Sequence, residues 1–104
     1  MSDACFELDV TWDPNKALAN LAKHAVSLAQ GATVLLDPLA LTVFDAEHGE
    51  GEERWFTLGT SSEDRLLAVS HTYEATSATS ARARIISARE ATRFERQQYE
   101  SEPH

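Results

Sequence analysis

Arginine is concentrated near the C-terminal end of this 104-residue chain. Residues 82–96 contain five arginines and only two glutamates, a local charge of +3 in a chain whose net charge is −8. If the first part of this segment is a strand, Arg82 and Arg84 point to one face because side chains alternate. If the second part is a helix, Arg89, Arg93 and Arg96 form one stripe. Such a patch is either a solvated surface or a site that binds an anion.

A second candidate group lies near the end of an expected helix, where a lysine precedes a histidine. Cations at this place stabilise the helix dipole, which is the simpler interpretation of Lys23 and His24. The same pair is also suited to chemistry, since an ammonium group binds phosphate and an imidazole transfers protons near neutral pH. Both interpretations stay open at this point.

The entrance of a later strand carries a third group. Glu53 and Arg54 offer a base and a phosphate-binding cation, and Trp55 follows as an aromatic surface for an unpaired base. The acidic segment before them, which contains His48, is typical of a solvated loop. His71 lies at the far end of a central strand, where its side chain either reaches a cleft or is partly buried.

Composition limits the classes of protein to consider. The chain is 42% hydrophobic and 25% charged, which predicts one soluble domain over residues 1–100 and a flexible tail over 101–104. No apolar run is long enough for a membrane span, and the single Cys5, expected as a small buried strand residue, allows no internal disulfide. We therefore expect a cytoplasmic protein. Seventeen acidic residues argue against indiscriminate binding of nucleic acid.

Motifs for cofactors are missing from the sequence. It has no glycine-rich phosphate loop, no CxxC or HExxH pattern and no nucleophile elbow, and its four histidines are scattered. We predict no cofactor and no metal site.

The patterns of hydrophobic and turn residues predict strands and helices in an α+β order. Asp13 and Pro14 begin a first helix, with an apolar stripe that includes Leu18 and Leu21. Ser27 caps a second helix that stops before Asp37. Strands are expected at 5–12, 39–44, 54–59, 65–73 and 82–86, with loops at 45–53 and 61–64.

The C-terminal part is predicted to contain a loop and a helix. Residues 74–81 are small and polar, as in a mobile loop. Ser87 and Glu90 fit a capping box that opens a last helix, running to about Tyr99. The apolar residues of that helix, expected to pack on the domain, are Ala88, Ala91, Phe94 and Tyr99. The expected fold is a compact antiparallel β-sheet with N-terminal helices and a C-terminal helix.

In combination, several short motifs resemble the BrnT family, the toxins of type II toxin–antitoxin systems. The segments are WDPNK at 12–16, Lys23-His24, Glu53-Arg54-Trp55 and RIISAR at 84–89. The resemblance extends from about Phe6 to Glu100. It implies a RelE-like microbial ribonuclease fold, metal-independent cleavage of RNA and inhibition of translation. It also implies a partner, a BrnA-like antitoxin of the ribbon-helix-helix type, which binds DNA and with which the toxin forms a hetero-oligomer.

The resemblance assigns roles to the candidate residues. Lys23, Arg54, Arg84 and Arg89 would hold the phosphate, while Glu53, His24 or His71 would move protons. The residues expected along the RNA are Trp55, Arg82, Arg93 and Arg96.

The chain departs from the family pattern in ways that leave a second interpretation. Ala25 follows the Lys-His pair where glycine is typical, and residues 74–81 are long and lack an arginine. Glu90 and Gln97 stand where basic residues are common. Each departure weakens a surface for RNA, so the alternative is a weak or inactive member that only pairs with an antitoxin-like partner. A free-standing DNA-binding regulator is the least favoured class, because no helix outside 89–96 offers a basic face.

Overall fold

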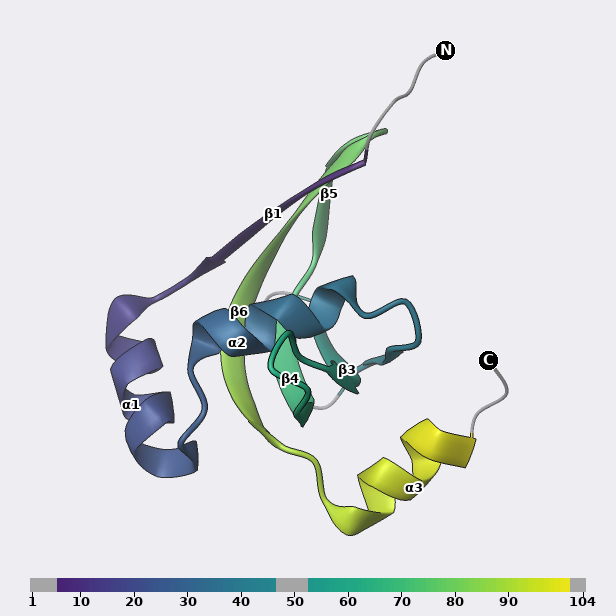
Figure 1. The fold of residues 1–104 in the computed structure, drawn as a ribbon. Coiled ribbons are helices and arrows are strands. Elements are labelled where there is room, and N and C mark those ends of the chain that lie inside the picture. Colours follow the sequence, from purple (N-terminus) through teal and green to yellow (C-terminus); the bar gives the residue numbers. More distant parts are fainter. Residues whose placement is uncertain (1–5, 47–52, 102–104) are drawn as a thin grey trace.

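The computed structural model describes residues 6–46 and 53–101 and confirms the α+β class (Figure 1). In chain order the elements are β1 (Glu7–Trp12), α1 (Pro14–His24), α2 (Leu28–Thr33), the 3-10 helix η1 (Val34–Leu36), β2 (Leu41–Phe44), β3 (Arg54–Thr60), β4 (Leu66–Thr72), β5 (Glu74–Ser77), β6 (Ser80–Glu90) and α3 (Arg93–Ser101). Three predicted features lie outside the described residues: Cys5 at the start of the first expected strand, the acidic segment 47–52 with His48, and residues 102–104 of the expected tail.

The six strands form one mixed sheet in the order β1-β6-β4-β3-β2, with β5 paired to the first part of β6. The central position predicted for β4 is confirmed. The prediction of a wholly antiparallel sheet is wrong, because β1 runs parallel to β6. These two strands come from opposite ends of the chain, so no hairpin between them dictates an antiparallel direction.

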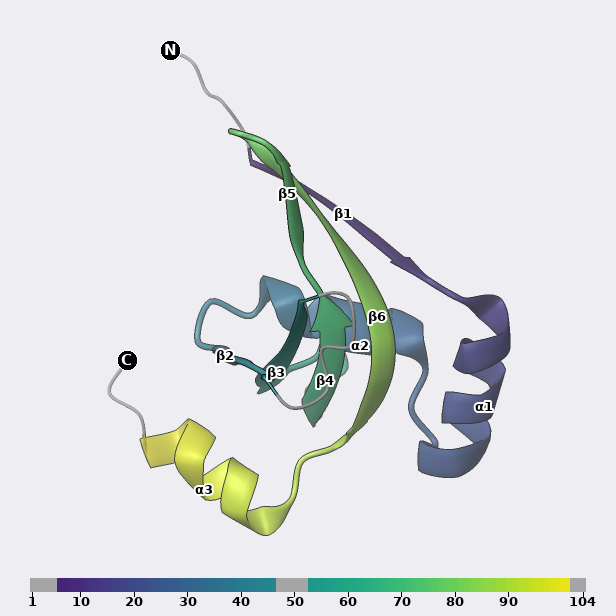
Figure 2. The ribbon, with the colours of Figure 1, turned by 180° about the vertical axis from the view of Figure 1, so that it is seen from behind.

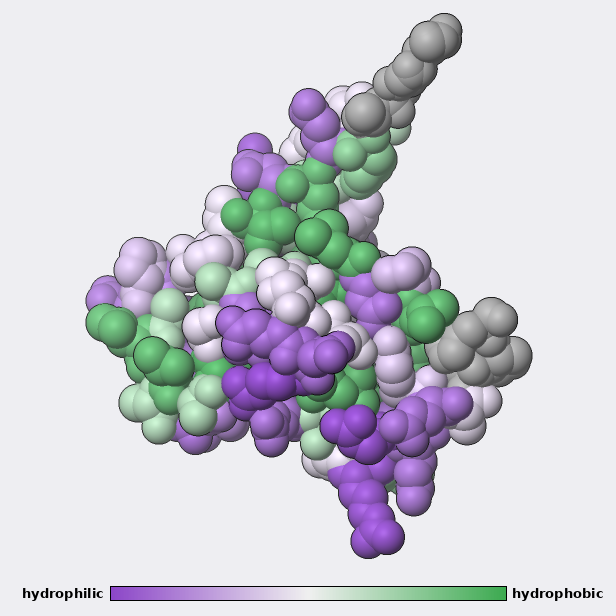
Figure 3. All heavy atoms as spheres, viewed as in Figure 1, coloured by the Kyte–Doolittle hydropathy of each residue, from purple (hydrophilic) through white to green (hydrophobic). Residues whose placement is uncertain are grey.

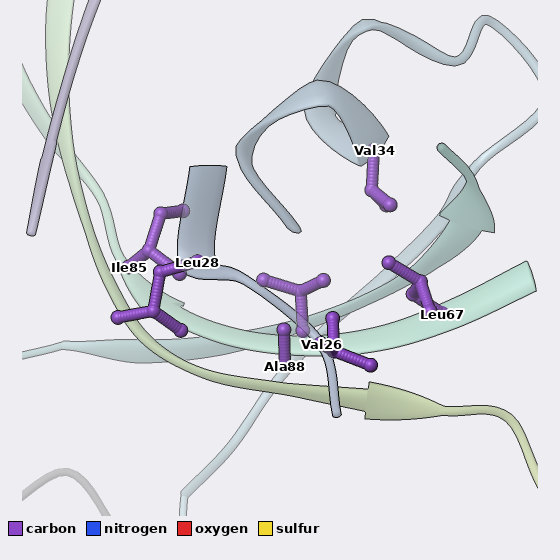
Figure 4. Packing of buried hydrophobic residues seen from close by; sticks show 7 residues of the cluster. Val26, Leu28, Val34, Leu67, Ile85 and Ala88 are labelled. Atoms are coloured by element: carbon purple, nitrogen blue, oxygen red, sulfur yellow. The ribbon is translucent and has the colours of Figure 1, made fainter. Parts of the chain in front are cut away.

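One face of the sheet is covered by α2 and η1, and the main core lies beneath them. Its buried residues are Val26, Leu28, Val34, Leu67, Val69, Ile85 and Ala88 (Figure 4). The helix approaches the sheet closely at Gly31, where an added Cβ would lie 2.8 Å from the Cβ of Ala88. This contact explains a glycine inside a helix, a position where it otherwise lowers stability.

Helix α1 begins as predicted but buries a different face. The Asp13 side chain accepts a hydrogen bond from the backbone N–H of Asn15, and Pro14 occupies the first helical position. The expected apolar stripe is exposed, with Leu18 68% and Leu21 51% accessible, whereas Asn20 is only 6% accessible. The apolar pattern was therefore the wrong guide to the buried face, because a polar side chain makes the contact with the sheet.

Asn20 takes the place of a strand neighbour at the edge of β6. Strand β1 pairs with β6 only as far as Ile85. Beyond that point the Asn20 amide donates to the carbonyls of Ala88 and Val26, both at 2.8 Å, and its oxygen accepts from the Ala88 N–H at 3.1 Å. These bonds satisfy buried backbone groups that a strand edge would otherwise leave unpaired.

The C-terminal helix starts later than predicted. The segment Ser87–Glu90, expected as a capping box, continues β6, because Ala88 is buried in the core and pairs with Val69. The capping box lies at Thr92 and Glu95 instead: the Glu95 N–H donates to Thr92 Oγ1, and the Thr92 N–H donates to Glu95 Oε1. Local capping patterns exist at both places, and tertiary packing selects the second.

Two further expectations for this region are corrected. Residues 74–81 are not a mobile loop but a hairpin in which β5 pairs with the start of β6. Together with β1 this hairpin forms an arm that projects from the sheet (Figures 1 and 2). Phe94 was expected to pack on the domain and is 67% exposed, while Ala91 and Tyr99 do contact a second apolar cluster around Leu58.

Candidate functional site

The sheet face opposite α2 carries most of the predicted phosphate ligands. Figure 2 shows this face, with α2 behind the sheet and α3 at one end. We call it the arginine face. Strand registers and side-chain alternation place the following residues on it: Arg54, Phe56, Ser70, Thr72, Arg84, Ser87 and Arg89.

A β-bulge brings Arg84 and Arg89 to the same face. In a regular strand, residues five apart point to opposite sides. In β6, Ser87 pairs with Ser70 while Ile85 pairs with His71, so Ile86 is an extra residue between them. The bulge reverses the alternation once, and Arg84 joins Arg89 on the arginine face.

Arg54 and Arg84 lie on either side of Thr72, on the strands that flank β4. Arg54 pairs directly with Thr72 across β3 and β4, and the Arg84 N–H donates to Thr72 Oγ1 at 3.0 Å. The Nε of Arg54 is shielded from solvent and has no hydrogen-bond partner among the described residues. A buried donor of this kind is costly to leave unpaired, so it favours an anion at this place.

Arg89 forms a bidentate ion pair with Glu95 of α3. Its two terminal nitrogens lie 2.9 and 3.0 Å from the carboxylate oxygens, and its guanidinium carbon lies 6.0 Å from the centre of the Phe56 ring. Hydrogen bonding to Glu95 raises the pKa of Arg89, and the same bond lowers the pKa of Glu95. Arg89 is therefore positioned on the face but already partly neutralised.

Lys23 and His24 lie at the edge of this face. They are the last residues of α1, and with Ser87 and Ile86 of β6 they line a shallow hollow of about 250 Å³. Because Ser87 belongs to the arginine face, this hollow adjoins it. The structure thus brings together a lysine, a histidine and three arginines from α1, β3 and β6.

The remaining predicted arginines are less central. Arg82 shares the face of Arg84, as the alternation predicted, but lies on the projecting arm, 3.5 Å from Glu74 and 3.9 Å from Asp9. The predicted stripe of Arg89, Arg93 and Arg96 does not exist, because Arg89 belongs to a strand. The two helical members are exposed on α3, and Arg96 pairs with Glu100 at 3.6 Å.

His71 and Trp55 lie on the opposite face of the sheet. His71 is 4% exposed, accepts at Nε2 from the Thr57 hydroxyl at 2.7 Å and donates from Nδ1 to the Thr72 carbonyl at 2.9 Å. Burial lowers the pKa of His71, which favours the neutral ring. Trp55 pairs across the strands with His71, and its ring meets Phe44 edge-on at 5.1 Å. The structure therefore separates both residues from the arginine face.

Glu53 lies at the end of the sheet. It lines a hollow there with Trp55, Thr72, Tyr73 and Glu74. Although Glu53 directly precedes Arg54 in the sequence, it lines the same hollow as Trp55.

Several residues of the arginine face were not predicted. Ser70, Ser87 and Phe56 lie between the Arg54–Arg84 pair and Arg89. Side-chain alternation within each strand was the only signal for these residues in the sequence. Placing them on the arginine face also requires the register between the strands and the position of the bulge.

The described residues provide no obvious metal centre: nowhere in 6–46 and 53–101 do three His, Cys, Asp or Glu side chains gather as ligands. No helix in that part of the chain is long and apolar enough to cross a membrane.

The buried His71 predicts that stability decreases in mild acid. Its pKa is lower in the folded state than the usual value of about 6.5, so the unfolded chain binds a proton first as the pH falls. The contribution of neutral His71 to the free energy of unfolding is fully present above about pH 6.5. It declines as the pH falls toward the pKa of the folded state. Urea unfolding of the wild type between pH 7 and 5 should show this decline. His71→Gln should flatten it, and an unchanged slope in that variant would contradict the assignment.

Fold and site together define a small α+β protein with a cationic sheet face suited to a phosphate-bearing ligand. The family model described as "Ribonuclease toxin, BrnT, of type II toxin-antitoxin system" matches residues 12–95. The chain therefore belongs to the BrnT family of ribonuclease toxins.

A solved structure supports the same fold. The Brucella abortus ribonuclease toxin BrnT, known from a 1.1 Å crystal structure, is 20% identical and superposes with a TM-score of 0.58. The match covers 83% of this chain and 99% of the Brucella chain. No curated protein matches the chain.

Proposed function

We propose that this protein is a metal-independent endoribonuclease toxin and that RNA binds across the arginine face. The observation that carries the proposal is the placement of Arg54, Arg84 and Arg89 on one face of the sheet, with Ser70 and Ser87 between them. The family supplies the class of reaction, and these cations supply a place for the scissile phosphate.

The reaction is an internal transesterification. The RNA 2′-oxygen attacks the adjacent phosphorus, the bond from phosphorus to the 5′-oxygen breaks, and a 2′,3′-cyclic phosphate and a 5′-hydroxyl result. A base takes the 2′-hydroxyl proton and an acid protonates the departing oxygen, while Arg54, Arg84 and Lys23 stabilise the phosphorane charge. His24, at the edge of the face, is the favoured proton carrier. Glu53 is the second candidate, and His71 is a poor one because it lies on the opposite face.

The biological role that follows is growth arrest in the cytoplasm through loss of translated RNA. A BrnA-like antitoxin, encoded alongside, would neutralise the toxin by forming a hetero-oligomer and would carry any contact with DNA. Type II toxins have a protein antitoxin, and the family assignment supports such a partner for this chain.

A low-activity or inactive binding module is the second candidate, and one observation favours it. Arg89 donates to both oxygens of Glu95, and Arg82 lies close to two carboxylates. Cations already paired within the protein bind phosphate less strongly. The pattern fits a member that retains the fold and its antitoxin while cleaving RNA slowly.

Incubation of the purified protein with RNA in EDTA separates the two candidates. Cleavage that continues in EDTA and yields cyclic phosphate ends supports the proposed enzyme. Intact RNA, together with tight binding of the protein encoded by the adjacent reading frame, supports the binding module. Expression of the chain alone, with growth as the readout, tests the toxic role.

Glu95→Gln should increase the affinity for RNA about threefold to tenfold. Glutamine retains the oxygen that caps α3 but loses the charge that neutralises Arg89. Partly exposed ion pairs contribute little to stability, so unfolding should shift by about 1 kcal/mol or less. Fluorescence anisotropy with a labelled RNA oligonucleotide measures the affinity, and Glu63→Gln on a distant turn is the control. Unchanged affinity in Glu95→Gln would show that the pair does not restrain Arg89.

A further inference from the structure

An apolar groove lies on the same sheet face as α2 and η1, in the part of that face that the helices do not cover. We call it the aromatic groove and define it by Leu8, Leu35, Thr42, Trp55, His71 and Tyr73. Its two overlapping hollows measure about 220 and 170 Å³, far more than the roughly 10–15 Å³ that one water needs. It therefore has room for large side chains.

The walls of the groove are exposed aromatic and aliphatic groups. Tyr73 is 38% exposed, and Phe44, whose ring contacts Trp55, is 51% exposed. In the space-filling view, hydrophobic surface continues above α2 along the projecting arm (Figure 3). The floor is His71, which burial keeps neutral. A contiguous exposed apolar surface is typical of an interaction site.

Carboxylates lie at one end of the groove. Glu53 and Glu74 line the adjoining hollow beside Trp55 and Tyr73. Glu74 is also 3.5 Å from Arg82. Glu7 and Asp9, the neighbours of Leu8 in β1, point to the opposite face of the sheet, where Asp9 lies close to Arg82. The groove is apolar inside and negative at the end that Glu53 and Glu74 border.

We propose that the aromatic groove docks a basic segment of a partner protein that inserts a large apolar side chain between Tyr73 and Leu35. This inference rests on the proposed function, in which the partner is the antitoxin. Charge complementarity identifies the occupant, because positive residues that follow an apolar anchor would meet Glu53 and Glu74 at the end of the groove. RNA fits this groove poorly, since its phosphates would meet the same carboxylates.

The position of the groove explains how a partner seated there would affect RNA. The groove ends at Glu53, which directly precedes Arg54 of the arginine face. A chain leaving the groove at this end passes the start of β3 and enters the space beside Arg54. Docking on one face of the sheet would thus direct the following residues of the partner toward the other face.

Binding of the purified product of the adjacent reading frame tests the proposal. Tyr73→Glu places a charge in the groove and should weaken binding at least tenfold, as expected for an aromatic anchor site. Glu74→Lys reverses an exposed rim charge in the short strand β5 and should weaken binding and reduce its dependence on salt. Matched controls are Leu18→Glu on the exposed side of α1 and Glu63→Lys on the turn before β4, and both should bind like the wild type.

RNA cleavage and thermal unfolding of each variant complete the experiment. Full cleavage with lost partner binding in Tyr73→Glu supports the proposal, and Glu74→Lys decides the matter if Tyr73→Glu unfolds. Tight binding by both groove variants, or loss of binding in Leu18→Glu, overturns it. Loss of RNA binding with an intact complex would make the groove an RNA site and also overturn it. If the wild type forms no complex, both the proposed partner and the groove assignment fail, whereas RNA cleavage in EDTA remains an independent result.

Discussion

Arg84→Ala should lower the rate of RNA cleavage by roughly 10²–10³-fold, the usual effect of removing one group that stabilises a charged transition state. Arg84 and Arg54 flank Thr72, so a phosphate bound over this threonine would lie between the two arginines. Arg54→Ala should cause a loss of similar size. The double variant should lose growth inhibition in cells.

The fold should survive these substitutions. The hydrogen bond that holds β6 to Thr72 comes from the backbone N–H of Arg84, and alanine retains it. Arg65→Ala is the matched control, because it removes an arginine that pairs with Glu90, away from the arginine face. Cleavage at the wild-type rate in both Arg54→Ala and Arg84→Ala would show that the reaction takes place elsewhere on the protein.

Asn20→Ala should destabilise the protein by roughly 2–4 kcal/mol, since several buried backbone groups lose their partner. The Asn20 amide makes three hydrogen bonds, two of them to the N–H and C=O of Ala88 in β6. For a domain of this size such a loss lowers the melting temperature by roughly 10–25 °C. It would also release Lys23 and His24 from the arginine face, because Asn20 joins α1 to β6.

Thermal unfolding followed by circular dichroism measures this effect. Asn15→Ala is the control, since Asn15 is an exposed residue of the same helix and its hydrogen bond to Asp13 comes from the backbone N–H, which alanine retains. A change of less than 1 kcal/mol in Asn20→Ala would mean that water replaces the amide at this edge.

Elements with strong local signals were predicted well. The cap at Asp13, the end of the helical segment before Asp37 and the central strand β4 follow from short patterns that do not depend on distant residues. The predictions failed where packing overrides local preference. Ser87–Glu90 resembles a helix start, yet Ala88 is buried against Gly31, and this contact holds the segment in the sheet.

Residue type alone proposes the arginines and the Lys-His pair as candidates for the site, but it does not give their arrangement. Their division between two faces depends on strand register, which fixes His71 and Trp55 on one side and Arg54 on the other. One extra residue reverses all later positions, so no pattern along the chain alone could have placed Arg89 on the same face as Arg84.

Because of the bulge at Ile86, the arginine face depends on the number of residues in β6 as well as on their types. The part of β6 before the bulge belongs to the projecting arm, and the part after it pairs with β4 in the packed sheet. An insertion or deletion of one residue at this point would keep every arginine in the protein while turning one half of the strand over. Either Arg84 would then face the core or Arg89 would. Divergence by substitution can weaken this surface gradually, but a change in the number of residues here would dismantle it in a single step.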